Sequence, residues 1–329
     1  MSRARLERWL TRRWYGAGAP LALRPLAGLY CAVSGLRRRL YRRHLLPVRW
    51  LDSRVVVVGS IAVAGSGKTP LVIALARRLR AAGLEVGILT RGYGGRSLRP
   101  PRPVLPDSDP FELGDEAVLL ARRSGAPVVA GADRHAAGRL LLSQHACDVV
   151  LCDDGLQHYA LGRDLEIALV DAAAEGNGRC LPAGPLREPR SRLSGVDALI
   201  GVGDAHPQGW SMQLQTGRPW CLQDSRQRRS LAEFCGERVH AVAGIARPQR
   251  FFEQLRQAGL EIEIHAFGDH HAFAAADLAF GDRRPVLMTE KDAVKCERFA
   301  QPHWWCVPVA ARPDAAFEDW LLAQLKQDT

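Results

Sequence analysis

Three features missing from this 329-residue sequence narrow the classes of protein to which it can belong. No run of about 20 uninterrupted apolar residues is present, as a membrane-spanning helix would require. The apolar stretch 19–36 is broken by Pro20, Arg24 and Pro25, and no signal-peptide cleavage site closes it. The eight cysteines form no C-x-x-C pair and no metal-ligand spacing. We therefore expect reduced thiols, as in a cytosolic protein.

Acidic residues are almost absent from the first fifty positions. Residues 1–50 hold twelve arginines and one acid, Glu7, so their net charge is +11. The net charge of the whole chain is +10, so the other 279 residues together carry about −1. A basic protein body would favour nucleic acid as a partner. A neutral body with one basic arm instead favours an anionic surface that this arm contacts, and we predict no nucleic-acid partner.

The basic arm also carries aromatic side chains: Trp9, Trp14, Tyr15, Tyr30 and Tyr41. Arginines with interspersed Trp and Tyr are typical of a helix that lies in a membrane interface, with its guanidinium groups on anionic head groups. We predict such a membrane-associating segment over residues 1–50. Two alternatives stay open, a basic helix packed on its own domain and an RNA-binding arm.

What the sequence does contain is a phosphate-binding loop. A β-branched run at 55–58 leads into a glycine-rich turn that ends in G-S-G-K-T at 65–69, and an apolar-periodic segment follows over 71–79. This order of strand, loop and helix presents backbone N–H groups and a helix N-terminus to phosphate oxygens. The residues predicted to contact the nucleotide are Ala62, Val63, Ala64, Gly65, Ser66, Gly67, Lys68 and Thr69.

Two side chains of this loop have specific roles in P-loop chemistry. The ammonium group of Lys68 reaches the β- and γ-phosphates, and the hydroxyl of Thr69 binds Mg²⁺. One position departs from the usual pattern, because Ala62 stands where the first glycine is expected. An alanine fits there only if its φ angle stays negative.

A second motif complements the loop about eighty residues later. Residues 148–152 predict a buried strand, which ends in Asp153 and Asp154. Acids at the end of such a strand hold the Mg²⁺ that bridges nucleotide phosphates. The sequence does not decide which of the two aspartates contacts the metal directly.

Strands and helices alternate along most of the chain, which predicts an α/β fold with a doubly wound, mostly parallel sheet. We place a P-loop domain at 51–207. The irregular, polar stretch 208–235 predicts a linker, and a second, smaller α/β domain is expected over 236–329.

Two loops offer further candidate site residues, each with a structural alternative. Asp115 begins a predicted helix, where it could be a general base or simply an N-terminal helix cap. In the Pro- and Gly-rich loop 176–192, Arg187 could bind phosphate and Glu188 could bind Mg²⁺, or the two could form a surface salt bridge.

The second domain carries two polar motifs. Adjacent side chains such as His270 and His271 cannot face the same way on a helix or a strand, so a His–His metal site is not expected. One of the two histidines, beside Asp269, could tune an acid–base group, or the motif could be the capped start of a helix. The motif T-E-K-D-A-V-K at 289–295 ends a strand, and we expect most of its charges to face solvent.

Taken together, these motifs resemble the tetraacyldisaccharide 4′-kinase (lipid A 4′-kinase) family of Gram-negative bacteria. The resemblance runs from the N-terminal helix to near the C-terminus. It rests on the motifs G-S-G-K-T-P, R-G-Y-G-G, G-D-E, D-D-G-L-Q-H, L-P-A-G-P-L-R-E-P, D-H-H-x-F and T-E-K-D-A-V-K. The family does not keep the first P-loop glycine, so Ala62 agrees with it.

The resemblance implies an ATP- and Mg²⁺-dependent kinase at the cytoplasmic face of the inner membrane. It would phosphorylate the 4′-hydroxyl of an acylated glucosamine disaccharide 1-phosphate and form lipid IVA. By family position Asp115 is the catalytic base and His270 its partner on the other domain, with Lys68 at the phosphates.

The metal residues implied by the resemblance are Thr69, Asp153, Asp154 and, more weakly, Glu188. No obligate protein partner is implied. Two other hypotheses stay open, a P-loop phosphotransferase that acts on a soluble substrate and a nucleotide-switched membrane adaptor ATPase.

Overall fold

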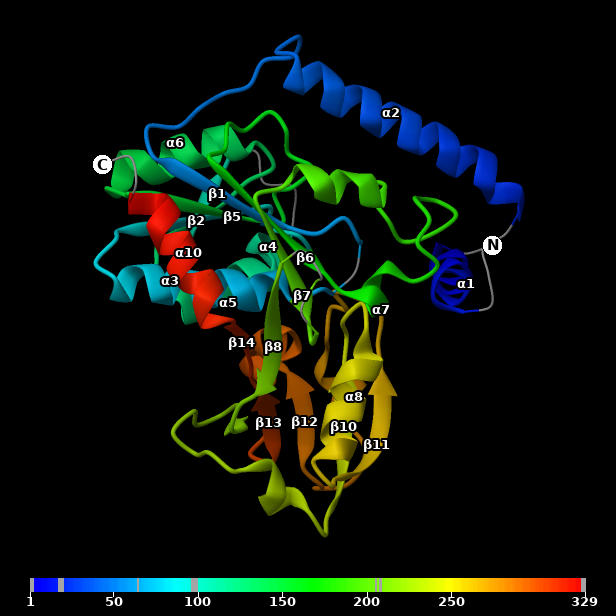
Figure 1. Cartoon of the computed structure of the whole chain (residues 1–329). Helices are drawn as coiled ribbons and strands as arrows, with labels where there is room; N and C mark the ends of the chain where they lie inside the picture. The colour runs from blue at the N-terminus through cyan, green and yellow to red at the C-terminus, as the bar shows by residue number, and fades with distance from the viewer. Residues whose placement is uncertain are drawn as a thin grey trace.

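The structure, a computed structural model, describes residues 3–16, 21–63, 65–95, 100–204, 206 and 209–326. Within them the chain forms two α/β domains, one on a nine-stranded sheet and one on a five-stranded sheet. Figure 1 shows the smaller domain below the larger one, with the first helices at the periphery of the larger one.

The large sheet has the strand order β14-β8-β7-β6-β1-β5-β2-β4-β3. All neighbours are parallel except the edge pairs β3–β4 and β14–β8. This confirms the predicted doubly wound, mostly parallel sheet. The strands are β1 (Arg54–Gly59), β2 (Val86–Thr90), β3 (Arg102–Val104), β4 (Val128–Ala130), β5 (Val149–Asp153), β6 (Leu165–Val170), β7 (Ala198–Val202), β8 (Trp210–Thr216) and β14 (Val309–Pro313).

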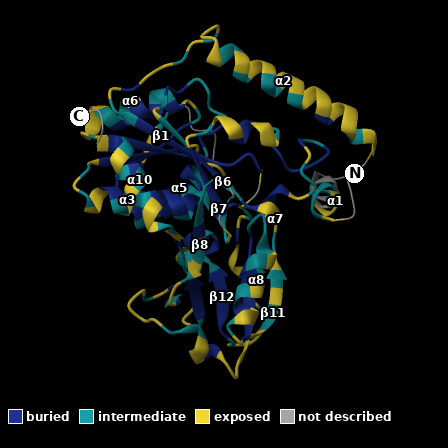
Figure 2. Cartoon of the chain, viewed as in Figure 1, coloured by how far each residue is buried: buried dark blue, intermediate teal, exposed yellow. Residues whose placement is uncertain are grey.

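Helices cover both faces of this sheet, which explains why its central strands are apolar throughout. On β1, Val56 and Val58 pack into the core under α3, α5 and α10, whereas Val55 and Val57 pack into the opposite core with α6. The helices are α3 (Lys68–Ala81), α4 (Pro110–Leu113), α5 (Asp115–Ser124), α6 (Arg134–Gln144), α7 (Ala172–Glu175) and α10 (Ala315–Lys326), with a 3₁₀ helix η2 (Arg190–Gly195). Figure 2 shows this buried interior in dark blue.

The small domain is built on the order β11-β10-β12-β13-β9, parallel except for β9. Its strands are β9 (Trp220–Cys221), β10 (Arg238–Ala243), β11 (Glu261–Ala266), β12 (Val286–Thr289) and β13 (Trp304–Val307). Its helices are α8 (Pro248–Gln257), α9 (Glu290–Cys296) and the 3₁₀ helices η3 (Leu231–Phe234), η4 (Ala275–Leu278) and η5 (Glu297–Phe299).

Two of the predicted domain boundaries are wrong. The predicted linker 208–235 contains β8, which is a strand of the large sheet. The predicted C-terminal domain 236–329 contains β14 and α10, which belong to the large domain. Strand β14 pairs antiparallel with β8, for example Ala310 with Gln215. Of β8 only Met212 is fully buried, so the strand lacks the continuous apolar run that marks a buried parallel strand.

The N-terminal arm forms α1 (Arg3–Tyr15), a 3₁₀ turn η1 (Leu21–Leu23) and α2 (Arg24–Arg42). No helix among the described residues is both long enough and apolar enough to cross a membrane. On α2 only Ala27 is buried, and Figure 2 shows the helix largely exposed. The indole of Trp14 donates to the carbonyl of Pro182 at 3.0 Å, which anchors α1 to the large domain.

The expectation that every cysteine is a reduced thiol is wrong at one pair. Cys31 of α2 forms a disulfide with Cys180, 149 residues further along the chain. Their separation in sequence gives no pairing signal, and only the packing of α2 against the loop after α7 brings the two sulfurs together. The other six cysteines are free.

Candidate active site

The phosphate-binding loop connects β1 to α3 at the carboxyl edge of the large sheet. Gly67 is the N-cap of α3 with φ +82°, and a side chain there would also meet Leu214 at 3.1 Å. Ala62 is buried and does not adopt a positive φ, as its type requires. Ala64, a predicted nucleotide contact, lies outside the described residues.

The Pro- and Gly-rich loop 176–192 braces the phosphate-binding loop. The N–H of Val63 donates to the carbonyl of Pro185 at 2.9 Å, and the N–H of Arg187 donates to the carbonyl of Ile61 at 2.6 Å. Backbone hydrogen bonds fix the two loops relative to each other, so the long loop has a positioning role that periodicity did not suggest.

Lys68, Asp154 and Arg187 form a charged group beside the loop. Nζ of Lys68 lies 3.5 Å from Oδ1 of Asp154, whose two oxygens accept from Arg187 at 2.7 and 2.8 Å. Burial opposes ionisation of Asp154, but the charges of Lys68 and Arg187 outweigh it and hold the pKa of that carboxyl below its usual range.

Asp153 is placed beside Thr69. The Thr69 hydroxyl donates to Oδ2 of Asp153 at 3.1 Å, while Oδ1 is buried with no hydrogen-bond partner. Burial and the neighbouring carboxylates Glu116 and Asp154 raise the pKa of Asp153 to about 7. A buried carboxylate oxygen with no donor beside a Thr hydroxyl is a donor set suited to a hard dication.

Glu188 is buried but lies one step away from these aspartates. Its oxygens accept from Gln157 at 3.1 Å and from the hydroxyl of Tyr159. Gln157 in turn accepts from Arg187 at 3.2 Å. Glu188 therefore connects to Asp154 through two side chains rather than by direct contact.

Asp115 and His270 meet across the two domains. Asp115 is the first residue of α5 in the large domain and is 3% exposed; His270 lies in the loop after β11 in the small domain. Nδ1 of His270 is 3.0 Å from Oδ1 and 3.1 Å from Oδ2 of Asp115. The adjacent His271 turns away to Asp277, at 3.1 Å, in line with the prediction that the two histidines face differently.

The charges of the pair depend on each other. Burial opposes ionisation of Asp115, yet the hydrogen bond with His270 and the charges of Lys291 and Lys295 together lower its pKa. The same hydrogen bond, against the effect of burial, raises the pKa of His270. The arrangement thus favours an ionised carboxylate that holds the imidazole ring in place.

The R-G-Y-G-G motif packs against the imidazole ring of His270. Gly94 has φ +83°, and a Cβ atom there would lie 2.9 Å from Nδ1 of His270. The ring of Tyr93 stacks on that of His270 with centroids 6.0 Å apart. The sequence shows a glycine-rich turn here, but only the structure shows that the missing side chain leaves room for the histidine.

The expectation that the charges of T-E-K-D-A-V-K face solvent is wrong. Lys295 is buried, with Nζ 3.5 Å from Asp115 and 2.9 Å from Asp292. Lys291 contacts Glu116, the residue after Asp115. The motif lies on α9, which packs against α5, so its charges meet those of the other domain rather than water.

A cavity of about 290 Å³ lies between the two domains. The large domain contributes Lys68, Asp154 and Arg187 to its lining, and the small domain contributes Arg247, His270 and Lys291. A P-loop on one wall and, on the other, a histidine that contacts a buried carboxylate define a class of protein, the P-loop phosphotransferases with a hydroxyl acceptor.

Comparison with known proteins gives the particular family. The sequence model of the family Tetraacyldisaccharide-1-P 4′-kinase matches residues 19–326. The chain is 48% identical to the tetraacyldisaccharide 4′-kinase of Nitrosococcus oceani, over 97% of this chain and 94% of that protein. It is 47% identical to the one from Pseudomonas aeruginosa, over 97% of each.

The chain therefore belongs to the tetraacyldisaccharide-1-P 4′-kinase family. It is a kinase of lipid A biosynthesis, a phosphotransferase with an alcohol acceptor. A crystal structure of LpxK from Aquifex aeolicus in complex with ATP superposes with a TM-score of 0.78. It is 26% identical and covers 92% of this chain and 98% of its own, which confirms the α/β fold.

Proposed function

We propose that this chain transfers the γ-phosphate of ATP to the 4′-hydroxyl of tetraacyldisaccharide 1-phosphate in the cleft between its two domains. The observation that carries the proposal is the contact of His270, which lines the same cavity as the P-loop, with both oxygens of the buried Asp115, at 3.0 and 3.1 Å. A nucleotide switch needs no acceptor base, so this pair favours the kinase over a membrane adaptor ATPase.

In the proposed reaction Asp115 accepts the proton of the 4′-hydroxyl while the hydroxyl oxygen bonds to the γ-phosphorus. The bond from that phosphorus to the β,γ-bridging oxygen breaks, and ADP leaves. A sugar hydroxyl has a high pKa, so a carboxylate within hydrogen-bond reach assists its loss of the proton. His270 orients Asp115, and Lys68 and Arg187 are placed to neutralise charge on the phosphates.

Because the base and its partner lie on different domains, the pair exists only when the two domains meet. Lys295 and Asp292 of α9 extend the contact, since Lys295 reaches Asp115 from the small domain. We expect the assembled cleft to exclude water and so to suppress hydrolysis of ATP without transfer.

Thr69, Asp153 and Asp154 are the residues that would hold Mg²⁺. The unpartnered oxygen of Asp153 beside the Thr69 hydroxyl fits such an ion, and both oxygens of Asp154 accept from Arg187, so Asp153 is the better direct ligand. When bound, Mg²⁺ neutralises the phosphate charge that develops during transfer. Glu188 then acts on this group indirectly, through Gln157 and Arg187.

We also propose that α2 binds the anionic surface of the inner membrane from the cytoplasmic side, where an acylated acceptor resides. Leu26, Leu29, Val33 and Leu36 are all exposed, and their spacing of three and four residues places them on one face of α2. Arginines at both ends of the helix suit anionic head groups. Trp14 and Cys31 tie this arm to the catalytic domain, so the cleft follows it to the surface.

The test is transfer of labelled γ-phosphate from ATP to detergent-dispersed tetraacyldisaccharide 1-phosphate. We expect lipid product from the unaltered chain and a loss in kcat of roughly 10²–10⁴-fold in Asp115→Asn, with ATP affinity retained. Asp109→Asn is the matched control, because Asp109 is an exposed helix-capping carboxylate six residues earlier.

Absence of lipid product from the unaltered chain would refute the kinase proposal in favour of a soluble acceptor or an adaptor. Full transfer by Asp115→Asn would refute the assignment of the base while leaving the kinase activity in place.

A further inference from the structure

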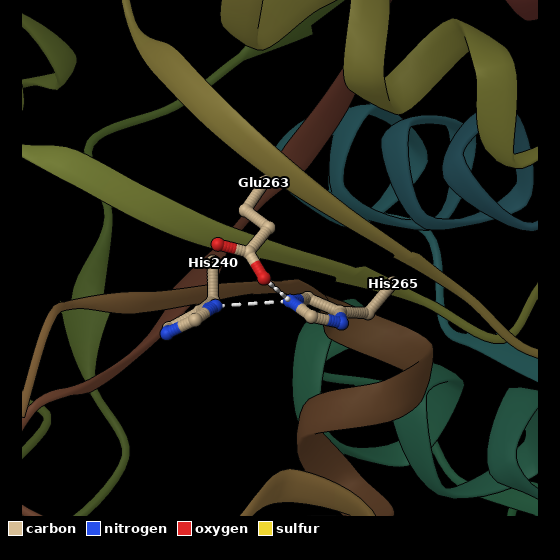
Figure 3. A group of neighbouring side chains, drawn as sticks. All are labelled: His240, Glu263 and His265. Carbon is tan, nitrogen blue, oxygen red and sulfur yellow. Dashed lines mark hydrogen bonds and ion pairs between the residues drawn. The ribbon is translucent and has the colours of Figure 1, made fainter. Parts of the chain in front are cut away.

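A cluster of histidines and carboxylates lies on the small domain, and none of its members lines the nucleotide cavity. His240 on β10 pairs in register with Glu263 on β11, and His265 lies two residues further along β11. Since side chains alternate along a strand, all three point to one face of the sheet. Figure 3 shows them converging, with the two imidazole rings side by side.

The distances between their ligand atoms suit one small ion. Nδ1 of His240 is 2.9 Å from Nε2 of His265, which is 3.8 Å from Oε1 of Glu263. Two ligands at about 2.0 Å from a tetrahedral zinc ion lie roughly 3.3 Å apart, a value between these two distances. All three atoms lie within 4.8 Å of one another.

Residues around the cluster hold the ligands in position. The other ring nitrogen of His240, Nε2, lies 3.1 Å from Oδ1 of Asp282. Arg284 donates to the outer oxygens, Oδ2 of Asp282 at 2.7 Å and Oε2 of Glu263 at 3.1 Å. These bonds leave Oδ1 and Oε1 facing the histidines, which is the carboxylate–histidine arrangement that supports metal ligands.

One side of the cluster is closed by an aromatic ring. Phe280 stacks on His240 with centroids 4.2 Å apart and on His265 with centroids 4.0 Å apart. His240 is buried, whereas Glu263 and His265 are partly exposed, so the open side of the cluster faces solvent.

We propose that His240, His265 and Glu263 form a zinc site, with Nδ1, Nε2 and Oε1 as ligands and water as the fourth. Two histidines, one carboxylate and an open position are a typical zinc ligand set. The site ties the edge strand β11 to β10 and, through Asp282, to the loop before β12. The loop that carries His270 follows β11, so the ion stabilises the edge of the domain that supplies this histidine.

The competing explanation is a hydrogen bond between the two rings without metal. Nε2 of His240 donates to Asp282, so its Nδ1 accepts, and Nε2 of His265 would donate to it. Zinc binding requires only that the proton of His265 sit on Nδ1 instead. His265→Gln separates the two explanations, because an amide N–H₂ can still donate to His240 but the variant lacks the ring ligand.

The experiment is calorimetric titration of the full chain with Zn²⁺ in excess Mg²⁺, which keeps the nucleotide-site carboxylates occupied. All variants carry Cys235→Ser, because Cys235 is an exposed free thiol that could bind zinc. We expect one Zn²⁺ per chain and a rise of about 5 °C in the unfolding midpoint at a hundredfold excess of Zn²⁺ over its dissociation constant. Co²⁺ should give the visible spectrum of a four-coordinate site.

His265→Gln is expected to lose roughly 100-fold or more in Zn²⁺ affinity, and Asp282→Asn about 10–100-fold. His145→Gln changes an exposed histidine at the C-cap of α6, and this variant should bind zinc as the parent does. The proposal is overturned if the parent takes up no Zn²⁺, or if His265→Gln binds with unchanged affinity and stoichiometry. Neither result bears on the kinase proposal, which rests on other residues.

Discussion

Replacing Gly94 by alanine tests how closely the R-G-Y-G-G turn controls the catalytic pair. The added Cβ would lie 2.9 Å from Nδ1 of His270, the same atom that contacts Asp115 at 3.0 and 3.1 Å. An ordinary contact begins at 3.4 Å, so the ring must move by about 0.5 Å. Movement of the ring away from Asp115 by that amount lengthens the contact to about 3.5 Å, beyond the usual hydrogen-bond range.

We expect Gly94→Ala to lower kcat for lipid phosphorylation by roughly 10–100-fold, because small misplacements of a catalytic group have effects of that size. The KM for ATP should not change, since the P-loop is untouched. The positive φ of Gly94 adds a backbone penalty of about 1–2 kcal/mol for alanine, which lowers stability independently of catalysis.

Gly83→Ala is the matched control, because Gly83 has a similar φ of +88° but no atom within 4 Å of the added Cβ. It should lose similar stability in a urea unfolding curve and keep its kcat. In a His270→Ala background, Gly94→Ala should add little further loss, because the two changes act on one contact. A Gly94→Ala enzyme with unaltered kcat, or a Gly83→Ala enzyme that loses as much, would refute the reasoning.

Three further predictions concern the surroundings of this pair and the N-terminal arm. The pKa of His270 is raised in the folded protein, so its protonation stabilises the fold fully below the unfolded pKa of about 6.5 and no longer does so once the pH has risen through the folded pKa. The free energy of unfolding lost in His270→Gln, measured by urea unfolding, should therefore be larger at pH 6 than at pH 9. An equal loss at both pH values would contradict the raised pKa. Lys295→Met leaves Asp115 and Asp292 as buried carboxylates without their shared cation, and the free energy of unfolding should fall by about 3–5 kcal/mol. A fall of less than about 1 kcal/mol would show that water reaches this site. The double variant Leu29→Glu/Val33→Glu changes two side chains of α2 that are 64% and 59% exposed, and it should abolish co-sedimentation with anionic vesicles. The control Leu105→Glu changes a loop side chain that is 60% exposed, and it should leave co-sedimentation intact. Retained binding of the double variant would contradict the role of α2.

Much of the nucleotide site was predictable because its chemistry is local in sequence. The Gly-rich turn, Lys68 and Thr69 are consecutive, and a strand of β-branched residues leads into them. The pair Asp153–Asp154 follows its own buried strand, so its place at the same sheet edge follows from the parallel order. Ala62 shows that the pattern tolerates a departure wherever the backbone angle permits one.

The small domain was harder to delimit, because the chain leaves the large sheet and returns to it. Strand β14 and α10 follow the small domain in sequence, yet they complete the large sheet beside β8. Hydrophobic periodicity marks that an element exists but carries no information on which sheet it joins, and β8 lacks even a continuous apolar run. The Cys31–Cys180 disulfide was not predicted for the same reason, since its formation depends on where α2 packs.

By itself the sequence determined that this protein binds nucleotide phosphates, that its sheet is mostly parallel and that a basic arm precedes its catalytic domain. Those properties depend on residues close together in the chain, where backbone geometry and helix dipoles act over a few ångströms. Residues alone left Asp115 between a helix cap and a base, and only the family resemblance favoured the base. The tertiary structure decided what Asp115 contacts, because His270, Lys295 and the space above Gly94 come from distant segments that meet only when the two domains pack. It also buried Asp292 and Lys295 of T-E-K-D-A-V-K, whose charges in isolation would have remained in water.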